Sequence, residues 1–302
     1  INDPTLAQLD PANIANFDPT QNNAQLIPTD FRRPYQGFGG ISERRYFKDG
    51  VTYHSIQVSL TRRLSNGFAG GVSYTGSRSY GLRGWDYFRT DAENRDRNTS
   101  AAGSRPHNLV VNYNYLVPGA SRFLGDNPIA AAALDGWQVS GVSTFQSGTY
   151  GSFSYAFTGA PRDMTNGLGG SRVVLTCDPT LPRGERTDLR QFRTECITFP
   201  GPTNVPGDTF YQGTAAPDAW LGLGYVNHDL TLFKNFAMAN RRNLQIRIEM
   251  YNALDAVQFG NVDTGAQFNF ATGAQTDTGF GTVTAGRANS ARVIQLGARF
   301  TF

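Results

Sequence analysis

Hydrophobic and polar residues alternate along several segments of the chain. The pattern is regular in residues 291–302, where apolar side chains stand between polar or glycine positions. A period of two predicts a β-strand with one apolar and one polar face. Six further segments show the same alternation, and residues 40–47 show it weakly. The six are residues 53–62, 68–80, 106–117, 136–150, 226–236 and 243–251.

Each predicted strand divides its residues between two chemically different faces. In residues 53–62, for example, Ile56, Val58 and Leu60 share one face, and Gln57 and Ser59 share the other. Apolar-out, polar-in alternation over about ten residues is typical of strands in outer-membrane barrels. The pattern therefore predicts an all-β fold, an antiparallel transmembrane β-barrel segment of about eight strands.

The connections between these strands are either short or long. Short turns follow Arg63, where Asn66 and Gly67 suit a tight hairpin, and Phe236; long loops follow Tyr80, Tyr150 and Asn252. Short turns of outer-membrane barrels are periplasmic and long loops extracellular. We therefore expect residues 151–222 to form a large extracellular loop. Residues 118–135 would be an unusually long periplasmic connection.

The amino-terminal region differs from the rest of the chain in composition and in its lack of alternation. Residues 1–37 are rich in Asn, Asp, Pro and Gln without periodicity, which predicts an irregular connecting segment. Residues 38–302 would be the carboxy-terminal portion of a barrel. The chain opens on Ile1 without a charged and apolar leader, so we expect it to be a fragment of a longer protein.

Composition supports a barrel wall and argues against other classes. Hydrophobic residues make up 39% of the chain, whereas Gly contributes 34 residues and Phe and Tyr 21 and 13. The longest apolar run, residues 129–134, is far short of the roughly 20 residues of a membrane helix. The net charge of +3 comes without a run of Lys or Arg, so no nucleic-acid partner is expected.

The end of the chain resembles a known targeting signal. Its pattern of a polar residue, a glycine and two aromatic residues is similar to the carboxy-terminal signal by which outer-membrane barrels are recognised for insertion. The residues are Gln295, Gly297, Phe300 and Phe302. The resemblance implies the barrel-assembly machinery and outer-membrane lipid as partners, and the bacterial outer membrane as the location.

Three longer passages resemble the barrel of TonB-dependent outer-membrane receptors of the Oar-like, carboxypeptidase-regulatory-domain-containing group. They run from Arg33 to Thr75, from Gly136 to Thr149, and from Leu232 to Gly260. The family tends to carry a second Asn three residues after Asn252, where this chain has Asp255. The resemblance implies a plug domain outside this chain, about 22 barrel strands, contact with the TonB complex through the plug, and uptake of an unknown solute.

Several polar side chains point to the predicted interior. We expect Gln57, Arg247, Glu249, Gln295 and Arg299 to face the lumen, where they could contact a plug or solute. The alternative, a ladder of cross-strand ion pairs in the wall, is favoured because charges in a barrel interior pair with one another. No Ser-His-Asp set or paired carboxylate cleft emerges, so we expect no catalytic residue and no enzyme.

Histidine and cysteine suggest little further chemistry. His54, His107 and His228 share phase with the apolar residues, on strands that would lie about 10 Å apart. This is too far to share a metal ion, so neither a metal nor another cofactor is expected. Cys177 and Cys196 lie in the large loop, and an oxidising compartment favours a disulfide between them over two free thiols.

Three functions remain open from the sequence. The first is part of a TonB-dependent transporter, the second a self-contained small barrel with a structural or adhesive role, and the third a soluble carbohydrate-binding β-sandwich. Because the inward residues are small and hydrophilic, we expect a curved antiparallel sheet whose first and last strands do not pair or pair poorly. A filled eight-stranded barrel would need bulkier interior side chains.

The orientation also predicts a ring of aromatic side chains at the short-turn rim, because aromatic residues favour the interfacial zone. The five residues of this ring are Phe68, Tyr115, Trp137, Phe236 and Phe302.

Overall fold

The computed structural model describes most of the chain from residue 51 onward. The described residues are 27, 31, 35–38, 51–85, 95–98, 105–125, 127–159, 172–201, 203–204, 213, 215–216, 218–238, 242–286 and 291–302. The predicted connecting segment 1–37 and the predicted strand 40–47 therefore lie almost entirely outside the described residues.

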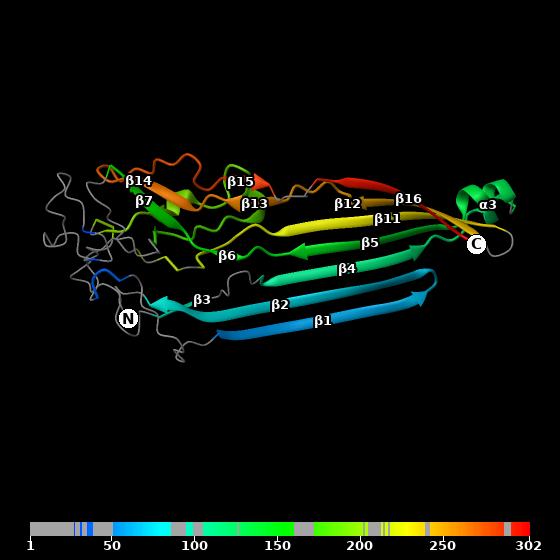
Figure 1. Ribbon diagram of the computed structural model, residues 1–302, viewed down its shortest axis with the longest axis horizontal. Coiled ribbons are helices and arrows are strands. Elements are labelled where there is room, and N and C mark those ends of the chain that lie inside the picture. Colours follow the sequence, from blue (N-terminus) through cyan, green and yellow to red (C-terminus); the bar gives the residue numbers. More distant parts are fainter. Residues whose placement is uncertain are drawn as a thin grey trace.

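One long antiparallel sheet dominates the structure (Figure 1). Neighbouring strands follow the order β1-β2-β4-β5-β11-β12-β16, and β3 pairs with the far end of β2. Their bounds are β1 Val51–Ser65, β2 Phe68–Trp85, β3 Arg95–Asn98, β4 His107–Leu116, β5 Trp137–Gln146, β11 Tyr225–Ala237, β12 Asn243–Tyr251 and β16 Val293–Thr301. The seven strands of the main path coincide with the seven strongly patterned segments of the sequence.

Strand pairing places apolar residues opposite apolar residues, and polar residues opposite polar ones. One row of directly opposed residues is wholly apolar, and the adjacent row on the other side of the sheet is almost wholly polar. The apolar row is Phe68, Tyr115, Val139, Leu232, Ile248 and Leu296. The polar row is Ala69, Asn114, Ser140, Thr231, Glu249 and Gln295. The sheet therefore has an apolar face and a polar face, as the alternation predicts.

The apolar face is open to its surroundings. Ile56 is 71% exposed, Leu60 68% and Leu296 74%. A water-soluble protein would bury a contiguous apolar surface of this extent, because such patches drive association. None of the helices in the described residues is long and apolar enough to cross a membrane.

Both hairpins of the sheet turn at the same end, which we call the short-turn end. Asn66 and Gly67 connect β1 to β2 with φ angles of 52° and 78°, the pair of positive values that a two-residue hairpin turn requires. A Cβ on Gly67 would also lie 2.8 Å from the backbone oxygen of Leu116. The predicted turn is therefore present, and only glycine fits its second position without strain.

The connection between β4 and β5, also at the short-turn end, contains a helix that the alternation did not predict. A 3-10 helix, η2 (Ser121–Leu124), precedes the α-helix α3 (Pro128–Leu134). Asn127 caps α3 by accepting a 2.8 Å hydrogen bond from the backbone N–H of Ile129, and Pro128 occupies the first turn, where its missing N–H costs nothing. α3 lies beside the ends of β5, β11 and β16 (Figure 1).

At the opposite end, the long connections fold together into a unit that we call the loop module, comprising the described parts of residues 150–222 and 256–286. It contains short strands and its own core. The strands are β6 Tyr150–Gly151, β7 Ser154–Thr158, β8 Val174–Leu175, β9 Ile197–Thr198, β10 Trp220–Leu221, β13 Phe259–Val262, β14 Gly265–Asn269 and β15 Val283–Gly286, with 3-10 helices η3 Arg183–Glu185 and η4 Thr194–Cys196.

Aromatic side chains from both long connections form the core of the loop module. The Phe192 ring lies 5.4 Å from the Trp220 ring and 5.2 Å from the Phe280 ring, measured between centroids. β7 and β14, which come from the two different connections, pair in parallel. Segments about 110 residues apart in sequence therefore share one core. The prediction of a large loop over residues 151–222 did not include this packed unit, because strands of two to five residues are too short to show a period.

β1 and β16 form the two ends of the sheet. Among the described residues neither pairs with the other, and in Figure 1 they lie on opposite sides of the sheet. The five aromatic residues expected at one rim all belong to the short-turn end: Phe68 and Trp137 begin their strands, and Tyr115, Phe236 and Phe302 lie at or just beyond the ends of theirs. Their depth in a membrane stays a prediction.

Candidate functional site

The polar face forms a hollow near the middle of the sheet. Its volume is about 540 Å³, and β1, β2, β4, β5 and β11 all contribute to it. The polar-face side chains around it include Thr61, Ala69, Asn112, Asn114, Ser140 and Asp229. Gly71, which also faces this side, leaves its space to Asn112, since a Cβ there would lie 2.7 Å from the Asn112 Oδ1. Small residues therefore keep the hollow open.

The amide groups of the hollow are partly engaged with each other. Asn114 Oδ1 accepts hydrogen bonds from Gln138 Nε2 at 2.7 Å and from Ser140 Oγ at 2.9 Å. These bonds connect β5 to β4 and fix the position of the Asn114 side chain. The surface can therefore hold water or contact a polar chain segment without rearrangement, because its donors and acceptors are already oriented.

Four of the five residues expected to face the lumen lie together on β12 and β16. Glu249 pairs directly with Gln295, and Arg247 pairs with Gly297. The Arg247 Nε lies 3.3 Å from the Glu249 Oε1, in an ion pair. Within the described residues this pair runs along one strand, rather than across strands as the sequence interpretation supposed, because Gly297 leaves the guanidinium free to lie over it.

Arg299 is the fourth residue on these two strands, and Gln57 is the fifth of the set. Arg299 lies opposite Gln245, which donates a 2.9 Å hydrogen bond to Asn235 Oδ1 on β11. Gln57 faces the same side of the sheet but lies on β1, opposite Thr75. The sheet order separates β1 from β12 by four strands, so Gln57 does not join the cluster at the carboxy-terminal edge.

A polar network that the sequence reasoning missed ties the polar face to the loops. Asp229, on β11, accepts a 2.9 Å hydrogen bond from the backbone N–H of Asn252. The buried Asn252 side chain in turn bonds both the N–H and the carbonyl of Ala256. Asp255 lies 3.8 Å from Arg292, just before β16. The sequence did hold one sign of this network. Asp229 lies two positions before Thr231, so the alternation places both side chains on the polar face.

The three histidines lie on the apolar face, near the loop end of their strands. His107 Nδ1 lies 2.8 Å from the hydroxyl of Tyr74, and His228 Nδ1 lies 2.8 Å from the hydroxyl of Ser143. His54 pairs with Arg78 across β1 and β2. In the part of the chain that the structure describes, no group of three potential ligand side chains could hold a metal ion.

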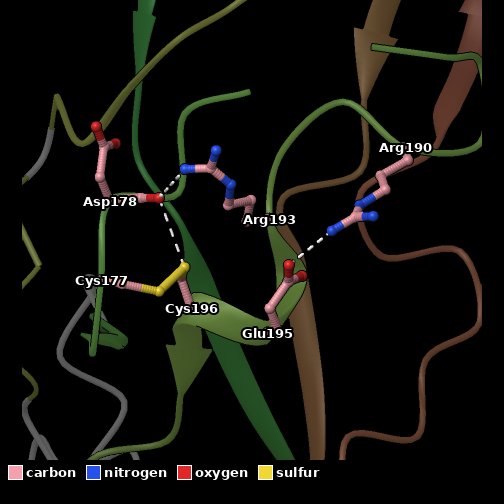
Figure 2. Close-up of polar contacts among 6 residues, drawn as sticks. All are labelled: Cys177, Asp178, Arg190, Arg193, Glu195 and Cys196. Atoms are coloured by element: carbon pink, nitrogen blue, oxygen red, sulfur yellow. Dashed lines mark hydrogen bonds and ion pairs between the residues drawn. A yellow bond between two sulfur atoms is a disulfide. The ribbon is translucent and has the colours of Figure 1, made fainter. Parts of the chain in front are cut away.

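The two cysteines are joined inside the loop module. Figure 2 shows the disulfide between Cys177 and Cys196, which closes a 19-residue separation. The Asp178 carbonyl beside it accepts a hydrogen bond from Arg193 Nη1 at 3.3 Å. Arg190 and Glu195 form a separate ion pair at 2.6 Å. Hydrogen bonding from Thr180 keeps the pKa of the Asp178 carboxyl below its usual range.

An all-antiparallel sheet with one exposed apolar face, one polar face, short turns at one end and long loops at the other is the geometry of a membrane barrel wall. A family model described as "Outer membrane beta barrel domain" matches residues 2–295. Comparison with the curated proteins gives no match, and neither does comparison with the solved structures. The chain belongs to the outer membrane β-barrel domain family, and it is a protein of the bacterial outer membrane.

Proposed function

We propose that the chain is the carboxy-terminal part of the barrel of a TonB-dependent outer-membrane receptor of the Oar-like group, which takes up a large solute. The observation that carries this proposal is the polar face. Small residues such as Ala69, Asn114 and Ser140 make up much of the polar-face lining of its hollow of about 540 Å³. The sheet that bears the hollow ends in β1 and β16, which do not pair with each other among the described residues.

The small interior side chains bear on the width of the barrel. An eight-stranded barrel has an interior just wide enough to be filled by its own side chains. Ala69, Gly71 and Ser140 are too small to fill it. Unpaired strand edges in hydrocarbon cost several kcal/mol for each backbone group, so further strands complete the wall. The wider lumen then has room for a plug domain, through which the TonB complex supplies energy.

The polar face offers two kinds of contact to a plug or solute. The Arg247–Glu249 pair is internally neutralised, so we assign it to the wall. The hollow around Asn112 and Asp229, and Arg299 near the carboxy-terminal edge, present hydrogen-bonding groups to the interior. Gln295, Gly297, Phe300 and Phe302 would serve as the signal read by the barrel-assembly machinery.

The size of the native protein and its binding to TonB test this proposal. An antibody raised against the loop module should detect, in outer membranes, a band much larger than the 33.0 kDa of this chain. The same protein should be captured by the periplasmic domain of TonB. A band of 33.0 kDa with no TonB capture would instead support a self-contained small barrel with a structural or adhesive role.

A further inference from the structure

Lys234 is out of place in the alternation. It lies on the apolar face of β11, between Leu232 and Phe236, and its direct cross-strand neighbours are Trp137 and Ile246. Only 6% of its surface is exposed. A Lys on the lipid-facing side of a barrel is costly, by about 2–4 kcal/mol at the membrane midplane and less near the interface. The placement therefore needs a compensating partner.

The short helix α3 supplies part of that compensation. Lys234 Nζ donates to the carbonyl of Ala133 at 3.2 Å and to the carbonyl of Asp135. The same ammonium lies 5.1 Å from the ring centroids of both Trp137 and Phe236. An ammonium has three N–H donors, and the described residues provide hydrogen-bond acceptors for two of them. The Asp135 carboxylate acts on the ammonium electrostatically, and the third N–H donor has no hydrogen-bond acceptor among the described residues.

A groove opens beside this ammonium, between α3 and the sheet. Its volume is about 380 Å³, within the range of small-molecule sites, and apart from Lys234 it is lined by apolar residues. Ala132 and Ala133 form the helix wall, and Leu232, Ile246 and Ile248 form the floor. The small alanine side chains leave the space between α3 and the sheet unfilled.

The groove continues the apolar face of the sheet and is lined by residues of α3 and of the neighbouring strands. α3 lies at the short-turn end (Figure 1). Short turns of outer-membrane barrels face the periplasm, so the groove belongs to the inner leaflet near headgroup depth. From this position we infer that the groove holds one acyl chain of a glycerophospholipid, whose phosphate accepts a hydrogen bond from Lys234. The apolar groove would bury the acyl chain, and the remaining N–H donor of Lys234 would form a charge-assisted hydrogen bond with the phosphate.

Exposed apolar side chains on the same connection support this position. Phe123, in η2, is 77% exposed, and Ile129, in α3, is 80% exposed. The Arg122 guanidinium lies 4.8 Å from the centroid of the Phe123 ring, an aromatic and cationic pairing that suits the boundary between headgroups and acyl chains. The connection would therefore lie in the interface and enclose the lipid against the barrel wall.

Native mass spectrometry of the full-length protein, extracted from outer membranes in mild detergent, tests the site. Wild type should retain one glycerophospholipid per chain. Ala133→Trp fills the groove from the helix, and Ile248→Trp fills it from the floor; each should lose the lipid. Leu60→Trp, on the apolar face of β1 and far from the groove, is the matched control and should retain it.

The role of the ammonium is tested separately, by adding back dioleoylphosphatidylethanolamine or dioleoylglycerol, which share their acyl chains. Wild type should prefer the phospholipid, and Lys234→Met should bind it about tenfold more weakly, because a charge-assisted hydrogen bond is lost. Equal binding of both lipids by wild type would overturn the assignment of Lys234. Retention of lipid by both groove-filling variants, or only detergent in the wild-type groove, would overturn the site itself.

Discussion

Gly297 lies directly opposite Arg247 in the pairing of β12 with β16, and this close approach explains why a side chain is absent there. A Cβ on Gly297 would lie 2.7 Å from the Arg247 Nε and 3.1 Å from its Cγ. These atoms belong to the middle of the side chain, so Arg247 could not yield without leaving Glu249. Gly297, which belongs to the proposed insertion signal, therefore also has a structural role in the wall.

Gly297→Ala should lower the free energy of unfolding by about 1 kcal/mol, since an overpacked contact and a partly exposed ion pair are lost together. Urea unfolding of the purified protein in micelles measures this change. Gly286→Ala is the control, because the nearest atom to its Cβ would be 3.7 Å away. In an Arg247→Ala background the penalty of Gly297→Ala should largely disappear; an equal penalty in both backgrounds would contradict the explanation.

At the scale of elements, the loop module depends on contacts that join distant segments. Its core unites aromatic residues from two long connections, and one disulfide ties η4 to the segment after β8. Arg186 lies within this module, where its guanidinium bonds the carbonyls of Leu181 and Leu221. Burial, and secondarily the neighbouring charge of Arg183, lower the pKa of Arg186 below its usual value.

Replacing both cysteines by alanine should destabilise the loop module and leave the sheet intact. A disulfide closing a loop of this length contributes about 3 kcal/mol, so trypsin should cleave after Arg183 and Arg186 up to about a hundredfold faster if cleavage follows local opening. A reductant should have the same effect on wild type and none on the variant. Unchanged cleavage in the variant would show that the aromatic core alone holds the module.

At the scale of the whole molecule, the proposal fixes an orientation in the membrane. The loop module would lie outside the cell, and the two tight turns and α3 would lie in the periplasm. The structure places all of these features at opposite ends of the same strands (Figure 1), so one labelling experiment checks the whole arrangement.

Leu189→Cys and Met238→Cys test this orientation. Leu189 is 80% exposed in the loop module, and Met238 is 46% exposed just after β11, at the short-turn end. A membrane-impermeant maleimide should label Leu189→Cys in intact cells and Met238→Cys only after the outer membrane is opened. Wild type, whose cysteines are joined in a disulfide, is the background control. The reverse labelling pattern would invert the topology.

The sequence by itself determined the strands, their two faces and the Asn66-Gly67 turn. These features depend on neighbouring residues, since side chains alternate along each strand and a tight turn depends on φ angles that few residues adopt. The alternation was therefore sufficient to place Val58 and Leu296 on one face and Asn112 and Glu249 on the other.

Only the tertiary structure decided what those faces hold. The hollow and the groove beside Lys234 depend on strand register, which brings residues as much as about 100 positions apart into contact. The loop module depends on packing between two connections that have no sequence period of their own. Periodicity reports the side of a strand on which a residue lies, whereas the identity of its neighbour there is a property of the folded sheet.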